Sequence, residues 1–135
     1  MAAIALAVAA RVNVVESIAQ VTSYAGAALV AGTGLRYDAN GRFIAALADT
    51  APNANLVGIA DKSAAIYQPV TAIRIGVMDG WDFTALAYGA PVYLATGGGL
   101  DTAAGTVSTI VGEVYAAHAQ SFGAAPDKLL WICIP

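Results

Sequence analysis

The side chains that could do chemistry are few and far apart in this chain of 135 residues. The single histidine, His118, stands among Ala, Gln and Ser, with no acidic residue or cysteine beside it to orient a base or complete a metal site. The single cysteine, Cys133, lies in the apolar run LLWICI, where a free thiol is expected to act as a small buried hydrophobe. One cysteine also excludes an internal disulfide. We therefore expect structural roles for both residues.

The remaining polar residues form no recognisable catalytic pattern. The nine acidic residues are spread singly. Asp79 and Asp82 flank a turn, but the alternating oxygen ligands of a calcium loop are missing around them. No serine stands in a GxSxG pattern, and the glycine run 97–99 is not followed by the Lys-Ser/Thr pair of a phosphate-binding loop. The sequence predicts no catalytic residue, no metal site and no cofactor, so we do not expect an enzyme.

The composition indicates a protein that works in contact with other proteins. Apolar residues make up 59% of the chain and charged residues 11%, whereas charged residues are usually about a quarter of a soluble domain. The net charge of −3 argues against nucleic acid as a partner. The longest uncharged stretches, 17–35 and 83–100, contain Gly, Pro or polar residues that do not suit a membrane-spanning helix. Excess apolar surface with little charge therefore predicts permanent association with other subunits.

The pattern of elements predicts an all-β fold. Short apolar runs alternate with turn residues, and the Asn40-Gly41 pair between two such runs is a strong hairpin signal. The clearest strand is 70–78, where alternation places Ile73, Ile75 and Val77 on one face. The run 129–134 looks like a closing strand buried on both faces. About eight to ten strands in so short a chain do not suit a flat open sheet, so we expect a small β-barrel or β-sandwich.

The N-terminal segment is expected to be an extended arm. Ile4, Leu6 and Val8 alternate with alanine, which suits a strand, although an Ala-rich segment could also pack as a helix. We divide the chain into an arm at 1–20 and a β-domain at 21–135. The arm is expected to be mobile in the free protein and to become ordered by adding main-chain hydrogen bonds to a neighbouring sheet.

Three aromatic residues complete the predicted interface. Trp81, Tyr88 and Tyr93 stand in the segments DGWDF, AYGAP and PVYLA. Each alone would be expected in the core, but Trp and Tyr are enriched at the centres of protein interfaces. We therefore expect some of the set to lie at a subunit contact. The predicted interface residues are Ile4, Leu6, Val8, Arg11, Trp81, Tyr88 and Tyr93.

The order of segments resembles that of tailed-bacteriophage head decoration proteins, also called capsid cement proteins. The succession is LVGIADKSA, QPVTAIRIGVMDG, ALAYGAPVYLATGGGLDT and TIVGEVYAAH, and the resemblance covers roughly residues 21–115. The family pattern, a G-x-x-V-Y-L…G-x-L segment followed by an I-x-G-x-V strand, is matched by Gly89, Val92, Tyr93, Leu94, Gly99, Leu100, Ile110, Gly112 and Val114. The N-terminus and the ending LLWICIP lie outside the resemblance.

The resemblance implies a small β-subunit that binds the outside of a mature icosahedral phage head. It implies a homotrimer that holds neighbouring subunits of the major capsid protein together, with no catalytic residues, present in the host cytoplasm during assembly and afterwards on the virion exterior. Three alternatives stay open at this point: a tail or baseplate component, a hydrolase assembled from distant polar residues, and a small-ligand or sugar-binding β-barrel. In the last of these, Trp81, Tyr88 and Tyr93 would line a pocket.

Overall fold

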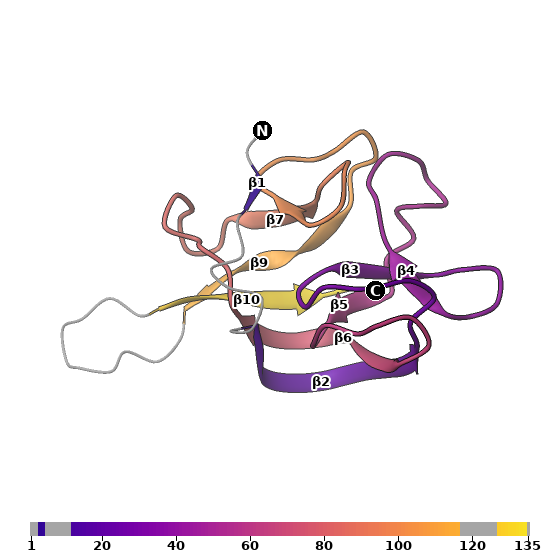
Figure 1. The fold of residues 1–135 in the computed structure, drawn as a ribbon. Helices are drawn as coiled ribbons and strands as arrows, with labels where there is room; N and C mark the ends of the chain where they lie inside the picture. Colours follow the sequence, from indigo (N-terminus) through magenta and orange to yellow (C-terminus); the bar gives the residue numbers. More distant parts are fainter. Residues whose placement is uncertain (1–2, 5–11, 117–126, 135) are drawn as a thin grey trace.

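A computed structural model describes residues 3–4, 12–116 and 127–134, and all regular structure in them is β. One ten-stranded antiparallel sheet curls strongly into a half-barrel (Figure 1). The predicted fold class, a small all-β barrel or sandwich, is confirmed. The strands are β1 (Ala3–Ile4), β2 (Asn13–Tyr24), β3 (Gly34–Tyr37), β4 (Phe43–Ala45), β5 (Gly58–Ala60), β6 (Pro69–Asp79), β7 (Pro91–Leu94), β8 (Leu100–Asp101), β9 (Ile110–Ala116) and β10 (Lys128–Cys133).

Strand β6 organises the sheet. The strand order is β1-β8-β7-β9-β10-β6-β5-β3-β4, and β2 pairs with β6 outside this path. One edge of β6 is divided between two partners, with Ile75–Met78 on β10 and Ala72–Ile73 on β5. Its other edge pairs with β2 from Pro69 to Asp79. A single strand therefore connects the two halves of the half-barrel.

The core consists of two clusters that meet along β6. The larger cluster contains Ile73 and Met78 of β6 together with side chains from β7, β9 and β10. The smaller cluster contains Val70 and Ala72 of β6 and centres on Phe43 of β4. The largest fully buried side chains are Phe43, Leu35, Ile59, Ile73, Met78, Leu94, Leu130, Ile132, Val70, Val92, Val111 and Val114.

The hairpin predicted at Asn40-Gly41 is present between β3 and β4, and its turn chemistry explains it. Gly41 has φ of +76°, a conformation that a side chain would strain. The carboxylate of Asp38 accepts hydrogen bonds from the backbone N–H of Asn40 at 2.8 Å and of Arg42 at 3.0 Å. The Asp38 N–H in turn donates to the Arg42 carbonyl at 2.8 Å.

The alternation predicted along 70–78 is wrong at one point. Opposite β2, the register steps from Ile75 directly to Ile73. Such a bulge shifts the two-residue period, so residues on either side of it exchange faces. Ile73 consequently packs in the larger core cluster, whereas Ile75 is only partly buried and lies opposite Cys133.

The N-terminal division is also changed by the structure. Residues 13–20, which the sequence placed in the arm, pair with β6 as part of β2. The boundary expected after residue 20 therefore lies within a strand, and we count 13–20 as part of the sheet. Nearer the N-terminus, Ala3 and Ile4 pair with β8 of the same chain.

The closing strand β10 is fully buried on one face and only partly covered on the other, where Leu129 is buried. Leu130 and Ile132 point into the core, but Trp131 is half-buried and Cys133 is exposed. The expectation that Cys133 is buried is therefore wrong. The physical reason is that the sheet curls around its own core, and nothing in the described part of the chain covers the convex face behind Cys133.

Candidate interaction surface

Of the predicted arm residues, Ile4 is the one that the structure describes, and it is buried. Ile4 is 8% exposed and packs in the larger core cluster, with Leu100 as its partner across the sheet. It is therefore not available to a partner while β1 stays paired with β8. Leu6, Val8 and Arg11 lie outside the described residues.

Two of the three predicted aromatic residues come together at one cleft. Trp81 and Tyr88 line a hollow of about 420 Å³ that follows the end of β6. Trp81 is 6% exposed and stacks on Phe83, with ring centroids 6.3 Å apart. Tyr88 is exposed, and the Lys128 ammonium lies 5.2 Å from the centre of its ring. The other residues of the lining are Asp79, Asp82, Phe83, Thr84, Asp127 and Lys128.

Three charged side chains of this cleft form hydrogen bonds to groups within or beside the turn after β6. The Asp82 carboxylate accepts hydrogen bonds from the Thr84 hydroxyl at 2.7 Å and from the Thr84 N–H at 3.1 Å. These bonds, the side-chain bond most strongly, lower the pKa of Asp82 from its ordinary value. Asp79 accepts from the Gly80 N–H at 2.8 Å, and Lys128 donates to the Leu86 carbonyl. Asp79 and Asp82 therefore stabilise the turn that they flank.

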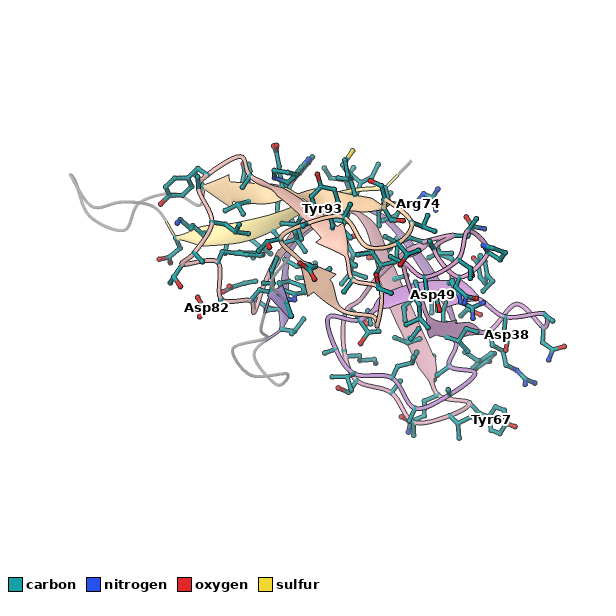
Figure 2. All side chains as sticks on the ribbon, turned by 90° about the horizontal axis from the view of Figure 1, so that it is seen from above. Asp38, Asp49, Tyr67, Arg74, Asp82 and Tyr93 are labelled. Carbon is teal, nitrogen blue, oxygen red and sulfur yellow. The ribbon has the colours of Figure 1, made fainter. Side chains whose placement is uncertain are left out.

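Tyr93 lies elsewhere. It is half-buried on β7, opposite Asp101 of β8 and Ile110 of β9. Figure 2 places Tyr93 well away from Asp82, which marks the cleft. The three predicted aromatic residues therefore do not line one common pocket.

Strand β2 is an exposed edge that the sequence reading missed. None of its twelve residues is buried, and Val15, Ile18 and Tyr24 are 55%, 59% and 60% exposed. Val15 and Ile18 are both bulge residues with no opposite residue on β6. Within the described part of the chain, β2 pairs with β6 alone, so its other edge is open. The bulges make this edge irregular, which opposes strand addition, and present two apolar side chains to solvent.

A second exposed apolar region lies on the convex face of β7, β9 and β10. We call it the outer groove and define it by Pro91, Ile110, Glu113, Trp131 and Cys133. Ile110 is 55% exposed, and the Cys133 thiol is exposed beside it. An adjoining hollow shares Ile110 and Cys133 and extends toward Leu56 and Ile134.

The third region is an aromatic tip at the far end of β2 and β6. Tyr67 is 62% exposed and has φ of +69°, a strained conformation for a residue with a side chain. The guanidinium carbon of Arg42 lies 5.1 Å from the centre of its ring. Behind it, Tyr37 stacks on the buried Phe43 with centroids 5.2 Å apart. Figure 2 shows Tyr67 at the opposite end of the molecule from Asp82.

Two further carboxylates support loops, Asp38 in the β3–β4 turn and Asp49 in the loop after β4. A backbone hydrogen bond from Arg42 is the largest cause that lowers the pKa of Asp38, while burial opposes it. The side-chain amide of Asn53 donates to Asp49 at 3.0 Å and is the largest cause that lowers the pKa of Asp49. Both carboxylates therefore hold turns in place.

Comparisons of the chain with models of known protein families, with curated proteins and with solved structures found no match. In the described ranges, no group of three His, Cys, Asp or Glu side chains could hold a metal ion. No helix in these ranges is long and apolar enough to cross a membrane.

Proposed function

We propose that this protein is a head decoration protein of a tailed bacteriophage, which binds the outside of the mature capsid and bridges coat subunits. Its partners are then the major capsid protein and further copies of itself, as a homotrimer on the virion exterior. The proposal is supported by the sequence resemblance and by the distribution of apolar surface over the molecule.

The residues of the resemblance are those that build one part of the fold. The residues that match the family pattern lie on or beside β7, β8 and β9, which are neighbours in the sheet. Val92, Leu94, Leu100 and Val114 are buried in the larger core cluster. Gly112 has no room for a side chain, because an added Cβ would clash with the Trp131 carbonyl oxygen. The matched pattern therefore specifies an architecture and carries no chemistry, as a structural subunit requires.

One observation carries the proposal: exposed apolar side chains lie on separate sides of the molecule. Val15 and Ile18 lie on the β2 edge, Tyr67 at the aromatic tip, and Ile110 in the outer groove, each with half or more of its surface exposed. A bridging subunit needs at least two contact surfaces, because linked weak contacts strengthen one another through effective concentration. A protein with one ligand site would need only one.

The proposal is tested by co-sedimentation with expanded heads and with precursor shells, after the mass of the free protein has been measured in solution. We expect attachment to expanded heads only, and a trimer in the free or bound state. A monomer with no affinity for either particle would refute the proposal.

A second candidate function is the binding of a small ligand such as a saccharide. It is favoured by one observation, that Trp81 and Tyr88 line the same cleft of about 420 Å³ beside three aspartates. Titration of the protein with mono- and oligosaccharides while Trp fluorescence is recorded tests it. A saturable change that is lost in Tyr88→Ala would favour this function over the capsid proposal.

A further inference from the structure

The outer groove carries one charge on an otherwise uncharged surface. Its two adjoining hollows, of about 340 and 470 Å³, share Ile110 and Cys133. Of all the residues that line them, Glu113 alone is charged. Glu113 is exposed on β9, between Pro91 of β7 and Trp131 of β10. No hydrogen bond or ion pair of its carboxylate occurs within residues 3–4, 12–116 and 127–134.

The combination of one carboxylate with the apolar side chains of Pro91, Ile110 and Trp131 around it restricts what can cover this groove. A wholly apolar segment would leave the carboxylate buried without a partner, which is strongly unfavourable. A second copy that packed the same face would bring two Glu113 carboxylates toward each other, which is also unfavourable. A cationic side chain would satisfy the carboxylate and keep the apolar contacts.

We propose that the outer groove is a docking site for an arginine, flanked by apolar residues, on a partner protein. The inference rests on the proposed function, in which that partner is the coat protein. The guanidinium pairs with the Glu113 carboxylate and stacks on the half-exposed Trp131 ring, while the aliphatic stem and its neighbours lie on Ile110 and Pro91. Arginine suits this site better than lysine, because its planar group can form a bidentate pair with a carboxylate and stack on an aromatic ring.

Cys133 allows the occupancy of the groove to be measured directly. It is the chain's only cysteine and lies in both hollows. In the free protein, we expect a maleimide to alkylate it at the rate of an exposed thiol. If Cys133 reacts slowly at high protein concentration and faster on dilution, a second copy occupies the groove. If it reacts slowly at every concentration, the chain itself covers the groove. Either result would overturn the proposal.

On expanded heads, we expect Cys133 to be alkylated at least tenfold more slowly than in the free protein. A control chain combines Cys133→Ala with Gly97→Cys, which moves the thiol to the exposed β7–β8 turn, outside the three exposed apolar regions. We expect the control thiol to react on heads at its free rate. Equal reactivity of Cys133 in free and attached protein would mean that this face does not dock.

Charge variants test the arginine. Glu113→Gln should weaken attachment to heads by about tenfold, and Glu113→Arg by more, because repulsion is then added. The control is Asp127→Arg, at another exposed carboxylate, which changes the net charge by as much as Glu113→Arg does. It should alter attachment less than twofold. Equal attachment of the wild type and Glu113→Arg would overturn the inference and leave the proposed function standing.

A peptide probe separates the two proposals. If the wild type binds no heads, the proposed function fails, but the groove can still be tested with acetyl-Leu-Arg-Leu-amide and its Glu counterpart at millimolar concentration. The Arg peptide should slow Cys133 alkylation in the wild type and not in Glu113→Gln. If neither peptide slows Cys133 alkylation, or if both slow it equally, the groove is not an arginine site.

Discussion

Strands β2 and β6 pair along their whole lengths, but their side chains lie in opposite environments. β6 has Val70, Ala72, Ile73, Gly76, Val77 and Met78 buried, whereas β2 has no buried residue. Both strands are rich in apolar residues, so composition does not separate them. The difference arises because β6 side chains lie within both core clusters, whereas Val14 and Val21 of β2 only pack against them from partly buried positions. β2 also has a neighbour on one edge alone (Figure 1).

The apolar residues of the two strands contribute to different processes, those of β6 to folding and, under the proposed function, those of β2 to binding. Apolar residues of β6 are removed from water by folding and stabilise the chain itself, at roughly 1.5–3 kcal/mol for a fully buried aliphatic side chain. Val15 and Ile18 of β2 gain little from folding, because more than half of each stays exposed. Their contribution is made only when a partner covers them, which is the property expected of a bridging subunit.

The largest expected effect is on β6. Ile73→Ala should lower the free energy of unfolding by about 2–5 kcal/mol, because the side chain is 1% exposed and its loss leaves a cavity. Urea unfolding followed by Trp fluorescence measures it. The matched variant on β2, Ile18→Ala, removes the same atoms from a side chain that is 59% exposed and should change stability by less than about 0.5 kcal/mol. If both variants lowered the free energy of unfolding by similar amounts, the two strands would not differ in their contribution to stability.

The contact between the two strands can be broken from the β6 side. An added Cβ at Gly76 clashes with the Glu16 carbonyl oxygen, which is backbone and cannot turn away. Gly76→Ala should therefore push β2 off β6, lower the free energy of unfolding by about 1–3 kcal/mol and speed hydrogen exchange in β2. Gly97→Ala is the control, because nothing lies within 4 Å of its added Cβ. If Gly76→Ala left β2 protected, the strands would be less closely joined than the structure indicates.

Ile18→Asp tests whether the exposed edge of β2 contacts a partner. Ile18→Asp places a charge on an exposed bulge residue, so stability should stay within about 0.5 kcal/mol of the wild type. Attachment to expanded heads should fall several-fold if this edge contacts a neighbour. Co-sedimentation across a concentration series measures it, with Gly97→Asp at the exposed β7–β8 turn as the control. Unchanged attachment would restrict the contact surfaces to the tip and the outer groove.

The smallest expected effect is at the turn after β6. The Thr84 hydroxyl is the largest cause of the lowered pKa of Asp82, so Thr84→Val should raise that pKa toward its ordinary value. A carboxyl whose folded pKa is lowered adds stability above its unfolded pKa and loses it as pH falls through the folded pKa. The two proteins should therefore differ slightly at neutral pH and converge in acid. NMR titration of the Asp82 carboxyl measures the shift, and an unchanged pKa in Thr84→Val would assign it to another cause. Asn53→Ala should leave Asp82 unaffected.

Some of the surface was predictable from residue types, and some was not. Tyr88 and Trp81 were both placed in the expected contact set, and they line one cleft because both follow β6 within one loop. That this cleft is a subunit contact stays a prediction. Ile4 was expected on a partner and is instead buried, because its segment returns to β8 of the same chain. Cys133 and Trp131 were expected in the core because LLWICI has no polar residue to mark an outer face. The lack of alternation in that run hid which side of β10 meets solvent.

What the sequence determined by itself was the class of structure: short apolar runs between Gly, Pro and Asn turns cannot sustain helices, and Asn40-Gly41 places a hairpin by local geometry alone. What only the tertiary structure decided was which apolar residues are covered. Bulges at Val15, Ile18 and beside Arg74 exchange the faces of the sheet, and the pairing of β2 with β6 and of β1 with β8 joins segments far apart in the chain. A local pattern records the period of a strand, but burial depends on its neighbours, and those are chosen only when the whole sheet closes on its core.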